Sequence, residues 1–353
     1  MANGSGTRLP GLADVHVHLR VPGAEHKEDF RSGTAAALAG GITTVMAMPN
    51  TNPPLVTLET WRAAQRRADA ESLCGVHLFA GASSAHTGEL PGLGHEAPAL
   101  KIYLDHTYGP LCVTDLSTMW MCFRSWPVNK PIALHAEGPR VAAGIGLAAA
   151  FGRPVHFCHV SRKEEIELIA AAKARGLPVT CEVTPHHLFL SQSDLPRLGP
   201  LGDMRPTLGE AADVKALWSH LDTTIDCIVT DHAPHTLPEK LASQGPPGVP
   251  GLETALPLML TAVTEGRLSM ARLVELMADN PRRIFGLPPQ PNTWVEIDPE
   301  ATYQLSNQGL HTKCGWSPFS GMTVRGMVRR VILRGKLVFE DGEVTAIHKT
   351  PEP

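Results

Sequence analysis

The sequence predicts an α/β protein with the (β/α)8 architecture of the TIM barrel and a small accessory β element near the C-terminus. Three observations support this fold class. Short apolar segments alternate with helical segments from residue 12 to about residue 235. The strand-like segments are apolar on both faces. The tail from about residue 322 alternates apolar and polar residues, which is typical of a β-hairpin.

Eight segments have the length and the aliphatic or β-branched composition of strands buried in a parallel sheet. They cover residues 12–19, 42–48, 76–81, 100–104, 132–136, 155–160, 179–183 and 225–230. Helical patterns lie between them, for example at residues 27–39, 58–70, 162–174 and 210–221. A doubly wound open sheet is the structural alternative, but the GxGxxG loop of that class does not follow the first strand.

The chain changes character after residue 235. A loop rich in proline and glycine covers residues 238–251, and helices are expected at residues 253–264, 269–278 and 281–284. Residues 328–339 and 342–347 are expected to form the hairpin. We therefore expect a barrel over residues 8–310 and an accessory β segment over residues 311–353. The lead-in of residues 1–11 is expected to belong to the accessory segment.

Composition excludes several classes of protein. The net charge is −4 and no basic run occurs, which argues against nucleic-acid binding. No stretch of 18 apolar residues is present, so we expect no membrane span, and the first seven residues lack the pattern of a signal peptide. The seven cysteines are scattered, odd in number and without a CxxC pair. This usage predicts free thiols in a reducing compartment, and we expect a cytoplasmic protein.

The first strand ends in a cluster of chemically active side chains. His16 and His18 are two residues apart, so both point to the same side of the strand, and Arg20 continues that row. Two imidazoles at this spacing form half of a metal site. Taken alone, the pair is explained equally well by core or surface histidines.

The same kind of residue recurs where other predicted strands end. These residues are Lys101, His135, His159 and Asp231. A buried carboxylate is costly unless it is paired or binds a metal, and barrel enzymes collect their catalytic residues at the carboxyl ends of strands. Lys101 alone would be explained as a lysine that extends to solvent, but core packing does not explain the whole set. The sequence therefore predicts a metal centre at this end of the barrel.

These positions resemble the amidohydrolase superfamily, whose members have a binuclear metal centre, and the finer pattern resembles dihydroorotase. The similar stretches are residues 14–20, 40–44, 47–51, 156–160, 184–187, 231–235 and 246–254. The resemblance extends from about residue 8 to residue 345. It implies a metal-dependent hydrolase that interconverts dihydroorotate and carbamoyl aspartate in pyrimidine biosynthesis.

The resemblance also implies the metal ligands. His16 and His18 would bind one Zn²⁺ together with Asp231, and His135 and His159 would bind a second. Carbon dioxide would convert the amine of Lys101 to a carbamate, whose two oxygens bridge the metals.

The animal-type members of the family also imply a third zinc site. In that arrangement His135 would be shared as an imidazolate, and Cys158 and Glu182 would complete the site. The metal count is therefore two or three per chain.

Further roles follow from the same resemblance. It assigns Arg20, Asn50 and His235 to the substrate carboxylate, and the ring to Arg205 and to backbone near Pro247 and Gly251. From the residues alone, Arg205 would be a surface loop residue and Asn50 a turn residue. We expect Asp231 to be the catalytic acid and base. Thr107 and Tyr108 correspond to a Thr-Phe pair on a mobile active-site loop, so the added hydroxyl is a departure from the family.

Two other functions remain open at this point. Another cyclic amidohydrolase, such as a dihydropyrimidinase, hydantoinase or allantoinase, would share the metal ligands but would not need Arg20 and Asn50 for a carboxylate. An inactive dihydroorotase-like subunit would be expected to lack ligands that this chain retains. The resemblance further implies a homodimer, and a place in a larger polypeptide with carbamoyl-phosphate synthetase and aspartate transcarbamylase.

Overall fold

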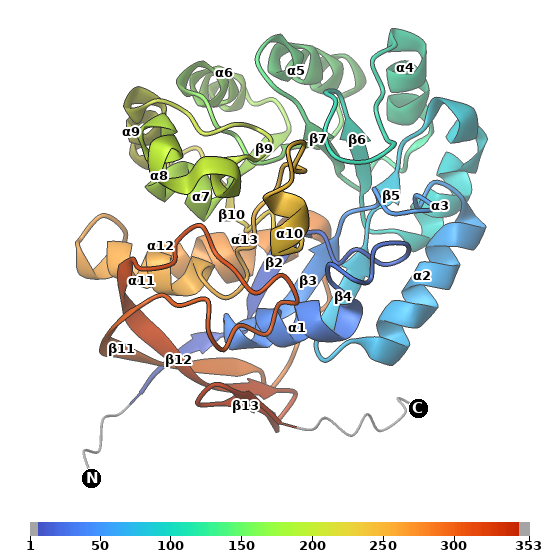
Figure 1. Ribbon diagram of the computed structural model, residues 1–353. Helices are drawn as coiled ribbons and strands as arrows, with labels where there is room; N and C mark the ends of the chain where they lie inside the picture. Colours follow the sequence, from blue (N-terminus) through green and yellow to red (C-terminus); the bar gives the residue numbers. More distant parts are fainter. Residues whose placement is uncertain (1–5, 346–353) are drawn as a thin grey trace.

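Strands and helices alternate through the first two thirds of the chain, as predicted (Figure 1). The computed structural model describes residues 6–345. Nine strand segments in this region are parallel to their neighbours: β2 (Leu12–Val17), β3 (Ile42–Ala47), β4 (Gly75–Leu78), β5 (Ala80–Gly81), β6 (Leu100–Tyr103), β7 (Ile132–His135), β8 (Val155–Phe157), β9 (Val179–Val183) and β10 (Cys227–Ile228). The predicted α/β class is therefore confirmed.

The parallel strands form two sheets that are linked at both edges. One sheet has the order β2-β3-β4 and the other the order β10-β9-β8-β7-β6-β5. β4 and β5 belong to one predicted strand, which changes sheets at Phe79, whose amide donates to the carbonyl of Ala47 over 3.0 Å. At the other edge, Val17 and His232 form a parallel bridge, and the His18 amide donates to the His232 carbonyl over 2.7 Å.

Helices cover the outer side of these strands (Figure 1). The longer ones are α1 (Phe30–Ala39), α2 (Leu58–Glu71), α3 (Leu90–Glu96), α4 (Leu116–Ser125), α5 (Pro139–Phe151), α6 (Lys163–Ala174), α9 (Ala211–Ser219) and α11 (Ala255–Thr264). Short helices are α7 (Pro185–Phe189), α8 (Leu195–Leu198), α10 (Leu237–Lys240), α12 (Met270–Val274) and α13 (Asn280–Phe285), with a π-helical turn at Glu275–Asp279 and 3₁₀ turns at Ser84–Glu89, Gln192–Asp194 and Gly199–Gly202. α10 lies at the start of the predicted loop of residues 238–251, where its four residues were too few to give a periodic pattern.

The core lies on both sides of the strands, which explains their continuous apolar character. One buried cluster includes Val15, Met46, Phe79 and Val229 from four of the parallel segments. Outside, the strands pack against the helices, and α5 comes close to them. A Cβ atom on Gly144 of α5 would lie 2.7 Å from a methyl group of Leu134 and 2.8 Å from the ring of Phe157.

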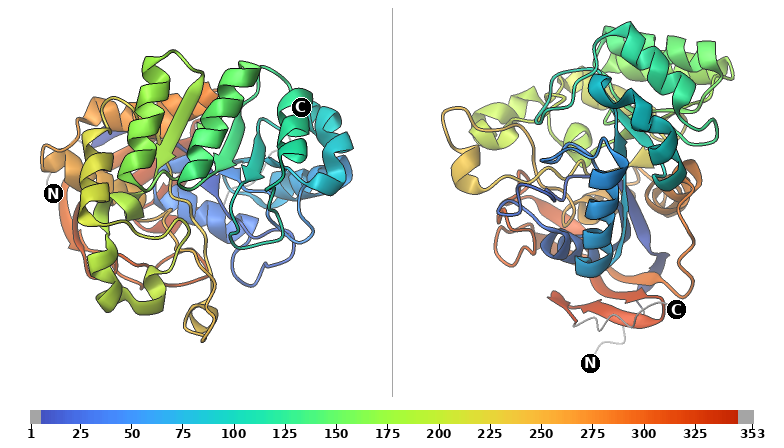
Figure 2. Two further views of the ribbon diagram at one scale, coloured as in Figure 1. Left: turned by 90° about the horizontal axis from the view of Figure 1, so that it is seen from above. Right: turned by 90° about the vertical axis from the view of Figure 1, so that its right-hand side faces the viewer.

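A five-stranded antiparallel sheet lies at one end of the molecule, next to α1 and α11 (Figures 1 and 2). Its order is β1 (Thr7–Pro10), β11 (Trp294–Gln304), β12 (Thr323–Leu333), β13 (Lys336–Glu340) and β14 (Glu343–Val344). The sheet therefore begins before residue 310, because it includes β11. The sequence does not predict β11, because Asp298, Pro299 and Glu300 break its alternation where the register with β12 shifts. Residues 346–347 of the predicted hairpin lie outside the described residues.

Two predictions from composition can be compared with the structure. All seven cysteines are free thiols, as predicted. Among residues 6–345, no helix combines the length and the apolar character that crossing a bilayer requires.

Candidate metal centre

The predicted metal ligands lie in the parallel strands or directly after them. His16 is in β2 and His18 follows it, Lys101 is in β6, His135 ends β7, His159 follows β8 and Asp231 follows β10. His159 and Asp231 have positive φ angles of 35° and 45°, and Arg20 has one of 60°. A non-glycine residue in this conformation costs about 1–3 kcal/mol, so the surrounding structure must hold these three side chains in place.

Two imidazoles face one oxygen of the Asp231 carboxylate. The Nε2 atoms of His16 and His18 lie 3.3 Å and 3.2 Å from Oδ1 of Asp231. On the far side of each ring, Nδ1 of His16 faces a carboxylate oxygen of Glu182, and Nδ1 of His18 lies 2.9 Å from Oδ1 of Asn50. Asn50 is oriented by its amide group, which donates to the Tyr108 carbonyl over 2.7 Å. Both Nδ1 atoms therefore donate, and both Nε2 lone pairs point toward Asp231.

The charges of these groups favour a bound cation. Burial lowers the pKa of His18 to about 4, so its imidazole is neutral at neutral pH. Burial opposes ionisation of Asp231, but its contacts with His16 and His18 hold the pKa of its carboxyl well below the usual value. Two imidazole nitrogens and an anionic oxygen thus converge on one point, which is the donor set that a transition metal such as zinc binds.

His159 and His135 extend this donor set to one side. The His159 ring lies 5.0 Å from the His16 ring and 4.4 Å from the His135 ring. Nδ1 of His159 is buried and has no hydrogen-bond partner within residues 6–345. A buried polar atom without a partner is costly, so a ligand that binds this nitrogen would stabilise it. His135 Nε2 lies 3.0 Å from a carboxylate oxygen of Glu137.

Lys101 is fully buried below the histidines. Its Nζ donates to Sγ of Cys158 over 2.8 Å and lies 5.0 Å from the centre of the Tyr103 ring. Burial raises the pKa of the Cys158 thiol well above its ordinary value, so the thiol is neutral. A buried ammonium beside a neutral thiol is poorly compensated.

Cys158 and Glu182 form a second group of possible ligands with His16. Their ligand atoms lie within 4.8 Å of one another. The structure thus places His16 beside Cys158 and Glu182, whereas the sequence-based expectation that His135 is the shared histidine stays a prediction. The Glu182 carboxylate contacts both His16 and His156, and its Oε2 atom lies 2.9 Å from Nε2 of His156. Burial opposes its ionisation, but these two rings lower the pKa of Glu182 to about 2.

A cavity opens above the metal ligands, and it contains several of the predicted substrate residues. Its lining includes His16, His18, Arg20, Asn50, Tyr103, Thr107, Tyr108, His135, His159, Arg205, Asp231, Ala233, Pro247 and Gly248. The predicted site residues Lys101, Cys158, Glu182, His235 and Gly251 are not part of this lining. Arg205 pairs with the carboxylate of Asp203 at the rim.

Arg20 brings a buried cation to the cavity lining. Its Nε donates to the Pro234 carbonyl over 3.1 Å, and its Nη2 lies 3.0 Å from Nε2 of His235. Burial lowers the pKa of Arg20 to about 10, so the guanidinium remains charged at neutral pH. A buried guanidinium with free N–H groups is suited to a carboxylate.

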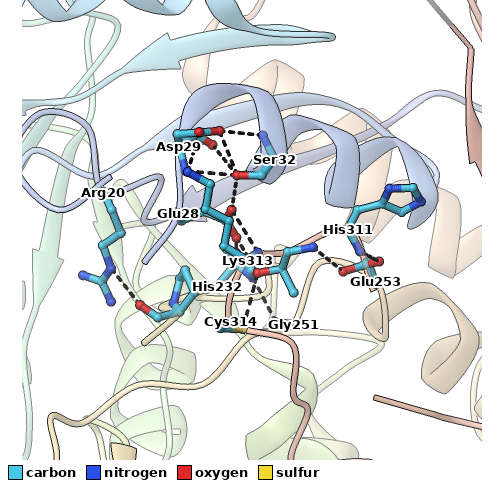
Figure 3. Close-up of polar contacts among 12 residues, drawn as sticks. Arg20, Glu28, Asp29, Ser32, His232, Gly251, Glu253, His311, Lys313 and Cys314 are labelled. Atoms are coloured by element: carbon cyan, nitrogen blue, oxygen red, sulfur yellow. Dashed lines mark hydrogen bonds and ion pairs between the residues drawn. The ribbon is translucent and has the colours of Figure 1, made fainter. Parts of the chain in front are cut away.

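Buried residues that were not predicted support the peptide around Asp231. Glu28 is fully buried and accepts hydrogen bonds from the hydroxyls of Ser32 and Thr312 and from the Lys313 amide. Nε2 of His232 lies 3.2 Å from one of its oxygens (Figure 3). Nδ1 of His232 accepts from the Gly251 amide over 3.2 Å, so the ring joins Glu28 to the Pro-Gly loop (Figure 3).

Asp14 provides a similar link on the strand side. Its carboxylate accepts from the amides of His16 and Thr230, each over 3.1 Å. Burial raises the pKa of Asp14 to about 7. A carboxylate within the apolar segment Leu12–Val17 was the signal that could have identified this residue.

Comparison with known proteins gives consistent results. Residues 7–89 match the family described as dihydro-orotase-like. The chain is 52% identical to the multifunctional protein CAD of Squalus acanthias over 96% of its own length, but it spans only 15% of that relative. It is 35% identical to the dihydroorotase of Mycobacterium leprae, covering 93% of this chain and 86% of that one.

Solved structures of similar fold include enzymes and an inactive domain. The L-hydantoinase of Arthrobacter aurescens has a TM-score of 0.91 and 26% identity, over 97% of this chain and 87% of that one. The inactive dihydroorotase-like domain of the CAD-like multifunctional protein of Chaetomium thermophilum has a TM-score of 0.82 and 29% identity, over 97% of both chains.

Proposed function

Because the chain belongs to the dihydroorotase family, we propose that it catalyses the reversible ring closure of N-carbamoyl-L-aspartate to L-dihydroorotate, a step of de novo pyrimidine biosynthesis. The observation that carries this proposal is the convergence of His16, His18 and Asp231 beside the buried guanidinium of Arg20. The first three residues suit a metal that acts on an amide, and Arg20 suits the carboxylate that both substrates bear.

We infer that the metal is zinc, because imidazole, carboxylate and thiol donors together match its ligand preferences. His16, His18 and Asp231 would hold one ion, and His135 and His159 a second. Cys158, Glu182 and the Nδ1 side of His16 would hold a third. When bound, zinc polarises a carbonyl oxygen and makes water a stronger acid.

We also propose that the amine of Lys101 is carboxylated. As an ammonium, Lys101 is a buried cation whose hydrogen bond goes to a neutral thiol. A carbamate would be anionic and would offer two oxygens to cations in a site of neutral histidines. This change would remove the poorly compensated charge.

The chain's own groups account for substrate binding and for the movement of the proton. Arg20 and His235 would bind the carboxylate, Asn50 would line the same subsite, and Arg205 and Pro247 would face the ring. In ring opening, Asp231 accepts a proton from the attacking water while the water oxygen bonds to the amide carbon. The carbon–nitrogen bond then breaks, and Asp231 returns the proton to the leaving nitrogen. Ring closure is the reverse of these steps.

Several broader features are proposals of the same kind. The link at Phe79 and the bridge between Val17 and His232 support closure of the two parallel sheets into one eight-stranded barrel, with β4 and β5 as one strand. We place the boundary of the accessory sheet near Trp294, because β11 belongs to that sheet. A homodimer, a place in a larger polypeptide and a cytoplasmic location remain proposals, the last supported by seven free thiols.

The test is ring opening of dihydroorotate compared with dihydrouracil, which lacks the carboxylate. We expect the zinc-replete protein to prefer dihydroorotate by at least about a hundredfold in kcat/KM, since Arg20 would be unpaired with the neutral ring. Equal rates on both rings would favour a hydantoinase or dihydropyrimidinase. Absence of zinc after zinc-replete purification, together with no turnover, would favour an inactive subunit.

A further inference from the structure

Lys27 connects three segments around the cavity. The residue lies in the loop before α1, and its side chain is only 6% exposed. Its Nζ lies 2.9 Å from the hydroxyl of Tyr108, 3.1 Å from Nδ1 of His235 and 3.3 Å from a carboxylate oxygen of Glu239. One ammonium group thus contacts the loop after β6, the loop after β10 and helix α10.

The contact with Lys27 fixes the proton position of His235. A lysine ammonium has three donors and no acceptor, so Nδ1 of His235 accepts its hydrogen bond. The ring proton is then on Nε2 and is donated to the Pro247 carbonyl over 3.1 Å. Nη2 of Arg20, which is also only a donor, lies 3.0 Å from the same nitrogen and makes no hydrogen bond to it in this tautomer. The Nε2–H of His235 and the N–H of Arg20 are therefore two donors side by side, an arrangement that an anion would stabilise.

The contact with Lys27 also fastens the loop that covers this pair of donors. The Tyr108 ring packs edge-on against His235 with a centroid distance of 4.8 Å, and the Arg20 guanidinium carbon lies 5.2 Å from the ring centre. The Tyr108 carbonyl accepts from Asn50. The Lys27 bond uses the hydroxyl that a phenylalanine would lack, so it adds a further attachment of this loop.

We propose that Lys27 is a positioning residue that holds His235 as an Nε2–H donor toward the substrate carboxylate and fastens Tyr108 over the same subsite. The proposal rests on the proposed function, because it takes the ligand to be a carboxylate-bearing ring. Binding of the substrate carboxylate and closure of the loop would then both depend on the Lys27 ammonium. Glu239 orients that ammonium from the solvent side, where its own carboxylate is 33% exposed.

Two variants separate the parts of this role. Lys27→Met keeps the length of the stem but removes all three contacts of the ammonium, whereas Tyr108→Phe removes only the bond to the loop. We expect Lys27→Met to raise the KM for dihydroorotate about tenfold, with kcat changed less than about threefold. Tyr108→Phe should raise KM less, and Lys27→Arg should restore part of the loss.

Loop closure is read without turnover by hydrogen exchange of the amides at residues 106–109. Exchange should be faster in both single variants than in the wild type, and the double variant should match Lys27→Met. The His235 tautomer is read from ¹⁵N chemical shifts of labelled histidine, assigned with His235→Asn. The wild type and Lys27→Arg should have the Nε2–H form, and Lys27→Met should show a mixture.

The control is Lys163→Met, which removes an exposed lysine that pairs with Glu167 on α6 and should leave every readout unchanged. Additive effects of Lys27→Met and Tyr108→Phe on loop exchange would overturn the proposal. An unchanged His235 tautomer in Lys27→Met would overturn it as well. If the wild type did not open dihydroorotate, the proposed function would fail, while exchange and tautomer would still decide the role of Lys27.

Discussion

At the scale of single residues, the neighbours of the metal ligands decide which nitrogen is free to bind. Asn50 and Glu182 take the Nδ1 protons of His18 and His16, which leaves both Nε2 lone pairs facing Asp231. Asn50 and Glu182 therefore orient the two histidines so that both Nε2 atoms can bind a cation beside Asp231. Such partners set the orientation and basicity of a ligating histidine.

We expect Asp231→Asn to lower kcat about a thousandfold in both directions, because an amide cannot accept and return the proton. The measurement is steady-state turnover of dihydroorotate and carbamoyl aspartate, with zinc content determined on the same samples. A kcat within about threefold of the wild type, at full zinc content, would contradict the assigned role.

Glu253 gives the protein a pH dependence that is separate from catalysis. Burial raises the pKa of this carboxyl to about 7, although the amides of His311 and Thr312 donate to it (Figure 3). Because the folded state holds the proton more tightly, the stabilisation is complete below pH 4.5 and is lost as pH rises through about 7.

The matched variant is Glu253→Gln, which keeps an acceptor and has no charge to bury. Between pH 5 and pH 8, we expect the wild type to lose roughly 2 kcal/mol of unfolding free energy relative to this variant. Urea unfolding followed by circular dichroism measures the difference. A wild-type minus variant difference that stays constant with pH would be the contrary result.

At the scale of elements, the strands could be predicted because burial on both faces leaves a continuous apolar segment. The positions of the ligands followed from them, since residues at strand ends share one rim. The histidine that joins Cys158 and Glu182 could not be predicted, because it depends on ring orientation rather than on strand position. Lys27 and Glu28 lie in a loop without periodicity, and only their burial in the structure identifies them.

Helix α5 offers a test of how closely helices pack on the strands. Gly144 faces Leu134 and Phe157, whereas a Cβ atom on Gly146 would meet nothing within 4 Å. Gly144→Ala should destabilise the protein by about 1–3 kcal/mol through overpacking, despite the better helix propensity of alanine. Gly146→Ala should stabilise it by about 0.5–1 kcal/mol. Thermal unfolding of both variants checks the signs, and equal shifts would refute the packing argument.

At the scale of the whole molecule, the metal site joins segments from most of the parallel strands. Removal of zinc by a chelator should abolish turnover and lower the melting temperature, because the folded state alone presents the full ligand set. Adding zinc should restore both. Differential scanning calorimetry with and without chelator measures the shift, and an unchanged melting temperature in zinc-free protein would show that the ions do not stabilise the fold.

The bridge between Val17 and His232 has a consequence for how the protein reaches its active form. It joins residues more than 200 positions apart, as does the contact of His18 with Asp231. Closing so long a loop is entropically unfavourable, and contacts of this range form slowly. A chain that is still being synthesised, or that has lost its last parallel strand, cannot assemble the His18–Asp231 pair. Zinc could therefore bind to this pair only after the chain has folded.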